Sequence, residues 1–322
     1  MSKKQIVVGI DIGGTLTKVG LVDREGNLFE NLDFPTTDYP DFDQYLSALQ
    51  GYIESLREKL TFDYELIGIG IGAPNGNALR GTIEHAANLK WKGIVPFLEK
   101  FKSFYSVPSY MTNDANAAAI GEMIYGNAAG LQNFMVITLG TGLGSGIVAN
   151  GELIYGHDAM AGELGHVLIK EGGRKCGTGR RGCLEAYVSS TGIKRTVFHL
   201  LSDSMDESVL RDYSYNDLHG EMIMKAAAEG DVIAQEAFRM TGEILGKQLA
   251  NFVAFSHPET IFLLGGLAKS GKWIFEPTAR YLEEGLLPFY KGKVKLKPSG
   301  MMGKNAAILG AAALVWKENH TS

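Results

Sequence analysis

The chain has 322 residues, 45% hydrophobic and 21% charged, which is typical of a globular protein with enough core for about two domains. Its formal net charge of −5 argues against a nucleic-acid partner, because binding a phosphate backbone requires clustered basic residues. Its apolar runs are too short for a membrane span or an export signal, and it has only two cysteines, so we expect a cytoplasmic protein without a membrane partner.

Strands and helices are predicted to alternate along the chain. Residues 5–34 predict a strand, a glycine loop, a second strand, a turn and a third strand, and a helix is expected over 43–60. Further strands are expected over 66–73 and 109–112, and an alanine-rich helix is expected from Asp114. After a second three-strand segment at 133–157, a long helix over 233–255 precedes a strand at 260–266 that ends in glycine. This alternation indicates an α/β architecture.

The two three-strand segments form an internal repeat. Aligning their glycine loops places Gly13 on Gly140 and Asp11 on Thr138, an offset of 127, and the turns that follow lie 125 residues apart. We therefore expect two similar domains.

The two glycine loops are candidates for binding phosphate. In "DIGGTLTK" and "TLGTGLGSG", glycine has no Cβ to hold a ligand away, so backbone N–H groups can converge on phosphate oxygens. Either loop alone fits a tight hairpin turn equally well, and their occurrence in equivalent places favours phosphate. Gly265 and Gly266 are interpreted as a strand end where the backbone approaches a flat ligand such as adenine, with a plain turn as the alternative. The candidates in the loops are Gly13, Gly14, Thr15, Lys18, Gly140, Thr141 and Gly142.

Seven motifs, in order along the chain, resemble the sugar kinases of the ROK (repressor, ORF, kinase) family, and most closely its bacterial glucokinases. They are "GIDIGGTLTK", "GAPNG", "NLKW", "NDANAAAIGE", "LGTGLGSGIV", "AGELGH" and "GCLEAY". The resemblance implies an actin-like, hexokinase-type fold of two RNase H-like domains, with ATP and the sugar in the central cleft. By analogy, the small domain comprises residues 1–112 and 305–322, and the large domain comprises residues 113–304. Homodimers are the family habit, and we expect one here.

The resemblance also assigns roles to two aspartates. Asp114 matches the base that takes the proton from the sugar hydroxyl, although its position alone favours a helix N-cap. Asp11 matches the aspartate associated with magnesium and phosphate, although by itself it would be a turn residue at a strand end. ATP and Mg²⁺ are therefore the expected cofactors.

Recognition of a sugar requires polar groups that pair with its hydroxyls, because a wrong sugar would leave buried donors or acceptors unpaired. Glu163 and His166 are three residues apart, so we expect them on one side of a helical turn. The resemblance implies that the matching family residues contact the sugar. The candidates besides Asp114 are Asn88, Asn113, Glu163, His166 and Glu185.

The stretch "RKCGTGRRGCLE" contains both cysteines. In the family, a histidine of the "GELGH" type and three cysteines spaced C-x-C-x₄-C hold a structural zinc, and the corresponding residues here are His166, Cys176, Thr178 and Cys183. The neutral hydroxyl of Thr178 is a far poorer zinc ligand than a thiolate. We therefore expect weak or absent zinc, and we expect a disulfide between the cysteines only in an oxidised sample.

The resulting prediction is ATP-dependent phosphorylation of a hexose, with glucose at its 6-hydroxyl as the first choice, by direct in-line transfer. A kinase for N-acetylglucosamine or N-acetylmannosamine, or a fructokinase, is the alternative, because the sequence does not reveal the wall of the pocket. The family also contains sugar-responsive transcriptional repressors with an additional DNA-binding domain. Because the first strand is expected by residue 5, we predict no such domain here.

Overall fold

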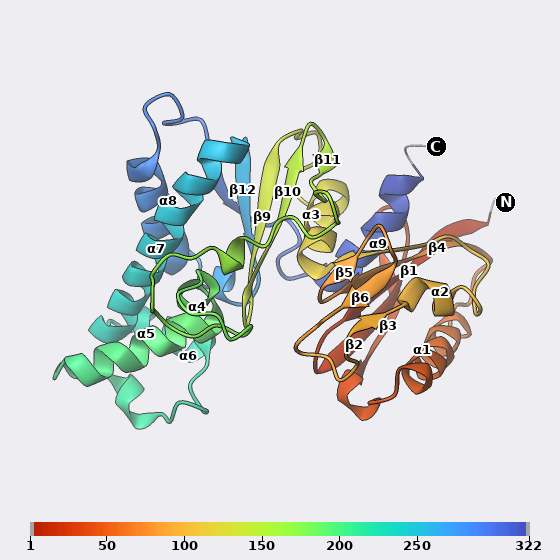
Figure 1. The fold of residues 1–322 in the computed structure, drawn as a ribbon, viewed down its shortest axis with the longest axis horizontal. Helices are drawn as coiled ribbons and strands as arrows, with labels where there is room; N and C mark the ends of the chain where they lie inside the picture. The colour runs from red at the N-terminus through yellow and green to blue at the C-terminus, as the bar shows by residue number, and fades with distance from the viewer. Residues whose placement is uncertain (1–2, 320–322) are drawn as a thin grey trace. The chain divides into compact units, whose positions relative to one another are not determined.

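A computed structural model describes residues 3–319 of the chain (Figure 1). Internal contacts divide the chain into two compact units. Unit 1 comprises residues 1–131, 153–162 and 303–322, and unit 2 comprises residues 132–152 and 163–302. The ends of the predicted small domain, residues 1–2 and 320–322, lie outside the described residues.

Unit 1 is built on a five-stranded sheet in the order β3-β2-β1-β4-β8. The first three strands form an antiparallel meander, whereas β4 and β8 run parallel to β1. The carboxyl ends of β1, β4 and β8 therefore lie at one edge of the sheet. The strands are β1 (Lys4–Ile12), β2 (Leu16–Val22), β3 (Leu28–Pro35), β4 (Tyr64–Ala73) and β8 (Ser109–Asn113).

Helices cover both faces of this sheet. On one face, α1 packs against β2 and β3, and its Leu49 and Ile53 share a core with Ile10 of β1. On the other face α9 approaches the strands closely, because a Cβ at Gly70 would lie only 1.9 Å from the carbonyl oxygen of Ala311. The helices of unit 1 are α1 (Phe42–Arg57), α2 (Phe97–Phe101), α3 (Asp114–Tyr125) and α9 (Ala306–Glu318), with a 3₁₀ turn η1 (Thr36–Asp38).

A smaller three-stranded sheet lies between β4 and β8 in the sequence. Its strands are β5 (Gly76–Asn77), β6 (Thr82–Glu84) and β7 (Ile94–Val95). Residues 85–93 form a loop without helix or strand, closed at its base by the His85 N–H, which donates to the Gly93 carbonyl at 2.8 Å. Arg80, just before β6, pairs with Glu84 and with Asp158, and thus links the 153–162 segment to the small sheet of unit 1.

Unit 2 repeats the architecture of the first sheet, in the order β11-β10-β9-β12-β13. Helices α7 and α8 pack closely, since a Cβ at Gly246 of α7 would lie 2.5 Å from the Thr278 carbonyl oxygen of α8. Within residues 3–319, neither α7, with its 25 residues, nor any other helix combines the length and hydropathy needed to cross a membrane. The strands are β9 (Phe134–Leu139), β10 (Leu143–Ala149), β11 (Glu152–Leu153), β12 (Thr260–Leu264) and β13 (Lys295–Pro298). The helices are α4 (Glu185–Val188), α5 (Ser190–Asp203), α6 (Gly220–Ala228), α7 (Val232–Ser256) and α8 (Lys272–Gly285), with 3₁₀ turns η2 (Leu164–His166), η3 (Val209–Asp212) and η4 (Leu267–Ser270).

The shared strand order confirms the predicted internal repeat and the α/β architecture. Helices α1 and α7 confirm the helices predicted over 43–60 and 233–255, with ends that differ by at most three residues. The third strand of the second segment is short, because the chain leaves unit 2 at Leu153.

The division into units differs from the boundary predicted after residue 112. Helix α3 packs against α9 and β4, so residues 113–131 group with unit 1 rather than with the large domain. The packing is tight, because a Cβ at Gly310 of α9 would lie 2.8 Å from the Ala117 carbonyl oxygen of α3. The return of residues 153–162 to unit 1 was not indicated by the sequence. The C-terminal helix α9 groups with unit 1, and the predicted domain bounds stay a prediction.

Candidate active site

Two aspartates lie at the carboxyl edge of the unit 1 sheet. Asp11 stands near the end of β1 opposite Gly72 of β4, and Asp114 directly follows β8 as the first residue of α3. Since Gly72 has no side chain, the aspartates approach each other across it. A Cβ at Gly72 would lie 3.8 Å from Asp11 Oδ1 and 3.7 Å from Asp114 Cα. Parallel pairing of β1, β4 and β8 thus brings together two carboxylates that are far apart in the sequence.

The surroundings raise the pKa of both carboxyl groups. Burial, followed by the charge of Asp114, raises the pKa of Asp11 to about 7, while Lys18 acts in the opposite direction. Burial also raises the pKa of Asp114, although the Ala115 N–H donates to its Oδ1 at 2.8 Å and lowers it. Protein atoms surround much of the Asp114 side chain, but part of it stays accessible to solvent. It therefore combines raised proton affinity with access for a substrate.

The N-cap of α3 is Asn113, not Asp114. Asn113 has extended backbone angles, and its side-chain oxygen accepts a hydrogen bond from the Ala115 N–H at 2.8 Å. Asp114 is already helical, so the alternative interpretation of this residue as the cap is wrong. Asn113 therefore has a structural role, and its contact with a sugar stays a prediction.

The first glycine loop is a tight hairpin turn between β1 and β2. The Gly13 N–H donates to the Leu16 carbonyl at 2.9 Å, which confirms the turn while its binding of phosphate stays a prediction. Thr15 is exposed at the tip, and Lys18 lies opposite Asp11 in the ladder of β1 and β2. The turn therefore offers a hydroxyl and an ammonium group beside the acidic pair.

Asn88 lies directly beside this turn. A Cβ at Gly14 would lie 2.7 Å from the Asn88 carbonyl oxygen and 3.2 Å from Asn88 Nδ2. The Asn88 side chain is exposed. A predicted sugar contact and a predicted phosphate loop are thus in contact within unit 1.

The second glycine loop occupies the corresponding place in unit 2. The Gly140 N–H donates to the Gly142 carbonyl at 3.1 Å, and β12 ends alongside because it pairs in parallel with β9. Gly265 has a φ of +106° and packs on β9, where a Cβ would lie 2.6 Å from the Leu139 carbonyl oxygen. The predicted glycine groups at 140–142 and 265–266 are therefore neighbours.

The start of α5 lies beside both of these turns, and the motifs did not reveal it. The Ser190 N–H donates to the Gly140 carbonyl at 2.8 Å, and a Cβ at Gly266 would lie 3.8 Å from Ser190 Oγ. Ser189 caps the helix by accepting the Gly192 N–H at 3.0 Å. The N-terminus of a 14-residue helix between glycine turns favours an anion. Two serines before a periodic apolar segment are the sequence signal for this helix start.

Three predicted sugar-binding residues lie together in unit 2. Glu163 Oε2 lies 3.8 Å from His166 Nε2, which confirms that the two share one side of the turn η2. Glu185 Oε1 lies 4.0 Å from His166 Nδ1 and accepts the Gly177 N–H at 3.2 Å. The Glu185 carboxylate also adjoins the second glycine loop, because a Cβ at Gly142 would lie 2.6 Å from its Oε2.

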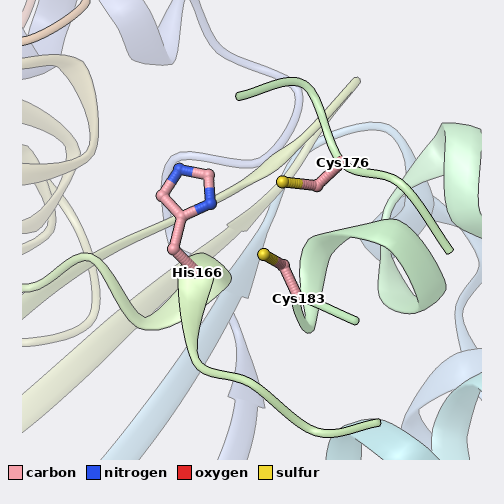
Figure 2. A group of neighbouring side chains, drawn as sticks. All are labelled: His166, Cys176 and Cys183. Atoms are coloured by element: carbon pink, nitrogen blue, oxygen red, sulfur yellow. The ribbon is translucent and has the colours of Figure 1, made fainter. Parts of the chain in front are cut away.

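His166 also joins the two cysteines. Figure 2 shows its ring and both sulfur atoms pointing toward a common point, and their ligand atoms all lie within 4.8 Å of one another. Both cysteines are buried, and among residues 3–319 the buried His166 Nδ1 has no hydrogen-bond partner. Thr178 Oγ1 lies 3.1 Å from Cys176 Sγ. This cluster contains three good donors for a soft metal ion.

The sequence profile of the ROK family matches residues 7–318, almost the whole chain. The chain belongs to the ROK family. A glucokinase of Halalkalibacterium halodurans is 33% identical to this ROK protein, over 98% of this chain and 96% of the relative. A glucokinase of Streptomyces coelicolor is 32% identical, over 96% of this chain and 97% of the relative.

A solved structure of a related protein resembles this ROK protein over nearly its full length. It is a ROK family glucokinase from Streptomyces griseus in complex with glucose and AMPPNP, with 29% identity and a TM-score of 0.82. The match covers 97% of this chain and 99% of the other. This likeness and the repeated sheet order confirm the predicted actin-like, hexokinase-type fold.

The donors of this ROK protein do not complete a structural zinc site. His166, Cys176 and Cys183 supply three potential ligands, and His166 Nδ1 has no hydrogen-bond partner among the described residues. A closed structural site needs four nitrogen or sulfur donors, and the fourth position holds the hydroxyl of Thr178, next to Cys176 Sγ. The residues therefore do not fit the four-ligand zinc of the family, and weak or absent zinc stays our prediction.

Proposed function

We propose that this ROK protein catalyses the ATP-dependent phosphorylation of glucose at its 6-hydroxyl. The glucokinases that match nearly its whole length, and the related structure bound to glucose and AMPPNP, support this proposal. The observation that carries the chemistry is the pair of carboxylates, Asp11 and Asp114, at the carboxyl edge of the unit 1 sheet.

Asp114 is the proposed general base. Its carboxylate has a raised pKa, reaches solvent and is fixed at the start of α3 by the Ala115 N–H. These properties suit a group that accepts the proton of the attacking sugar hydroxyl during phosphoryl transfer. Asn113, as the cap of the same helix, accepts the same Ala115 N–H and stabilises the first turn of α3, which carries Asp114.

Asp11 is the proposed magnesium-associated carboxylate. Carboxylate oxygens are ligands that Mg²⁺ prefers, and the position of Asp11 beside the first glycine turn fits this role. When bound, magnesium neutralises charge on the transferring phosphoryl group. Proton loss from Asp11, whose pKa is about 7, would accompany binding.

The remaining predicted residues bind the two substrates in this proposal. They form two groups. The first group holds the nucleotide and its phosphates, and the second group pairs with the sugar hydroxyls. The first comprises Gly13, Gly14, Thr15, Lys18, Gly140, Thr141, Gly142, Gly265 and Gly266. The second comprises Asn88, Asn113, Glu163, His166 and Glu185.

We also propose that the protein acts in glycolysis as a cytoplasmic homodimer. Both Cys176 and Cys183 are free thiols, and thiols stay reduced in the cytoplasm.

The decisive test is release of ADP from magnesium ATP with glucose, mannose, fructose, N-acetylglucosamine and N-acetylmannosamine compared in one series. We expect the highest kcat/KM with glucose and little ADP release without sugar. A clear preference for an N-acetylhexosamine or for fructose would replace glucose as the substrate. If no sugar raises ADP release above the sugar-free rate, the proposal of a sugar kinase fails, and binding of DNA would then be measured.

A further inference from the structure

The loop of residues 85–93 has little support of its own. It contains no helix or strand, and its ends are joined by the hydrogen bond from the His85 N–H to the Gly93 carbonyl. Asn88, near its middle, is exposed and touches Gly14 of the first glycine turn. The position of Asn88 therefore depends on the side chains that fasten the loop to the rest of unit 1.

Ala86 and Leu89 of this loop are buried in the core of unit 1. Lys90 and Trp91, two and three residues after Asn88, add side-chain hydrogen bonds to the rest of the unit. Lys90 Nζ donates to the Thr37 carbonyl at 2.7 Å, and Trp91 Nε1 donates to the Tyr39 carbonyl at 3.0 Å. The Trp91 ring is buried and lies 4.4 Å from the Tyr45 ring, measured between centroids. Both donors thus reach residues 36–39, which contain the turn η1.

The same segment also holds the first glycine turn. The Thr36 N–H donates to the Thr15 carbonyl at 2.9 Å. The Thr36 hydroxyl lies 2.8 Å from that of Thr17, which in turn lies 3.0 Å from the Tyr45 hydroxyl. These hydroxyls are buried, so their hydrogen bonds are sheltered from competition by water. Residues 36–39 therefore serve as a common anchor for the turn and for the loop that carries Asn88.

We propose that Lys90 and Trp91 are positioning residues that hold Asn88 against the first glycine turn for sugar binding. This inference rests on the proposed function, because it takes Asn88 as a sugar contact. Each side chain acts by holding the loop: Lys90 donates to the Thr37 carbonyl and Trp91 donates to the Tyr39 carbonyl. Neither side chain needs to touch the substrate. Loss of a donor allows Asn88 to move from its place beside Gly14, which weakens sugar binding in the ground state and the transition state alike.

The chain offers a matched pair of lysines for the test. Lys90→Met removes the ammonium donor to Thr37 and keeps most of the length of the side chain. Lys92→Met is the control, because Lys92 Nζ donates at 2.8 Å to the Leu89 carbonyl within the loop. Lys90→Arg keeps a donor and should retain activity. Trp91→Phe removes the N–H and keeps an aromatic ring in the core.

The readout is the separate measurement of kcat, the KM for glucose and the KM for ATP, together with thermal unfolding. For Lys90→Met we expect a rise of about 3- to 10-fold in the KM for glucose, the value of one ordinary hydrogen bond, because the exposed Lys90 ammonium also interacts with water. We expect kcat and the KM for ATP to change less than about twofold, since the bonds from Thr36 to Thr15 and Thr17 remain. Trp91→Phe should act in the same direction, and Lys92→Met should match the wild type.

Three results would overturn the inference. The first is an unchanged KM for glucose in both Lys90→Met and Trp91→Phe. The second is an equal rise in Lys92→Met, which would indicate general loosening of the loop. The third is a rise in the KM for glucose that occurs only in variants whose unfolding temperature is lowered. If the wild-type protein phosphorylates no hexose in the same assay, the proposed function itself has failed, and this inference falls with it.

Discussion

The two sheets of the molecule share one strand order but present different side chains at their carboxyl edges. In unit 1, β1 carries Asp11 and β8 is followed by Asp114. In unit 2, the position equivalent to Asp11 is Thr138, and β13 is followed by Ser299. The strand ends of unit 1 are therefore acidic, whereas the equivalent strand ends of unit 2 are neutral.

This difference shows how a repeated backbone can serve two tasks. Both units place a glycine turn after the first strand, so both can offer backbone N–H groups to an anion. Thr138 completes the turn of unit 2 by accepting the Gly144 N–H at 3.2 Å. The strand ends of unit 2 add no carboxylate of their own to the turn, although Glu185 of α4 adjoins it at Gly142, whereas the strand ends of unit 1 supply the two carboxylates proposed for proton transfer and for magnesium.

The largest effect is expected when the acidic edge loses its proposed base. Asp114→Asn should lower kcat by about 10²- to 10⁴-fold, the usual contribution of a general base. Because Asn113 is the cap of α3, and because burial disfavours the ionised Asp114 carboxyl, the unfolding temperature should not fall. Glucose-dependent ADP release and thermal unfolding of both proteins would measure this. Near-normal turnover in the variant would assign the base to another residue.

A substitution at Gly265, directly after β12, tests the packing of the turns in unit 2. Gly265→Ala should destabilise the protein by about 2–3 kcal/mol, because alanine is strained at a φ of +106° and its methyl group would meet the Leu139 carbonyl. Gly140→Ala is the matched variant, since a Cβ there has open space around it. It should keep the stability of the wild type and raise the KM for ATP if phosphate lies close to this turn. Urea unfolding would separate the two, and equal stabilities would contradict the strain argument.

Asp11→Asn should remove a pH dependence of stability. The Asp11 carboxyl has a pKa of about 7 in the folded protein, against about 4 in an unfolded chain. Between these values the folded state binds the additional proton, so the wild-type free energy of unfolding falls as pH rises and levels off above pH 7. Asn at position 11 does not titrate, so the free energy of unfolding of the variant does not fall through this group as pH rises.

At pH 8 without magnesium, Asp11→Asn should therefore be more stable than the wild type by about 1–2 kcal/mol, because the carboxyl keeps partial contact with water. The advantage should shrink at pH 5. Thermal unfolding of both proteins at the two pH values tests this. A constant difference would show that the raised pKa of Asp11 does not contribute to stability.

The smallest effect on catalysis is expected in unit 2 at the thiol cluster. Thr178→Cys would add the fourth soft donor beside His166, Cys176 and Cys183, and the variant should retain one zinc ion per chain through dialysis. The wild type should lose its zinc under the same conditions, and kcat should change less than about twofold. Metal analysis after dialysis is the measurement. Tightly held zinc in the wild type would contradict our reading of Thr178.

The sequence by itself determined the local features of this protein. Periodic apolar residues and glycine punctuation were sufficient to predict the repeat, the long helices α1 and α7, and the strand before Asp114. The two glycine loops between strands were also predicted, and the tight turn was the alternative to phosphate binding, because a hairpin turn depends on a few adjacent residues. The spacing of Glu163 and His166 predicted their proximity for the same reason.

The tertiary structure decided which of these local features meet. The approach of Asp11 to Asp114 depends on parallel pairing across Gly72, and the contact of Asn88 with Gly14 depends on the attachment of a loop to residues 36–39. Ser190 reaches the second glycine turn only because α4 and α5 return to β9. The grouping of residues 113–131 and 153–162 with unit 1 likewise depends on packing partners that are distant in sequence. Local preference acts over a few residues, whereas strand pairing and helix packing join segments a hundred residues apart, and a single sequence carries no direct signal of those partners.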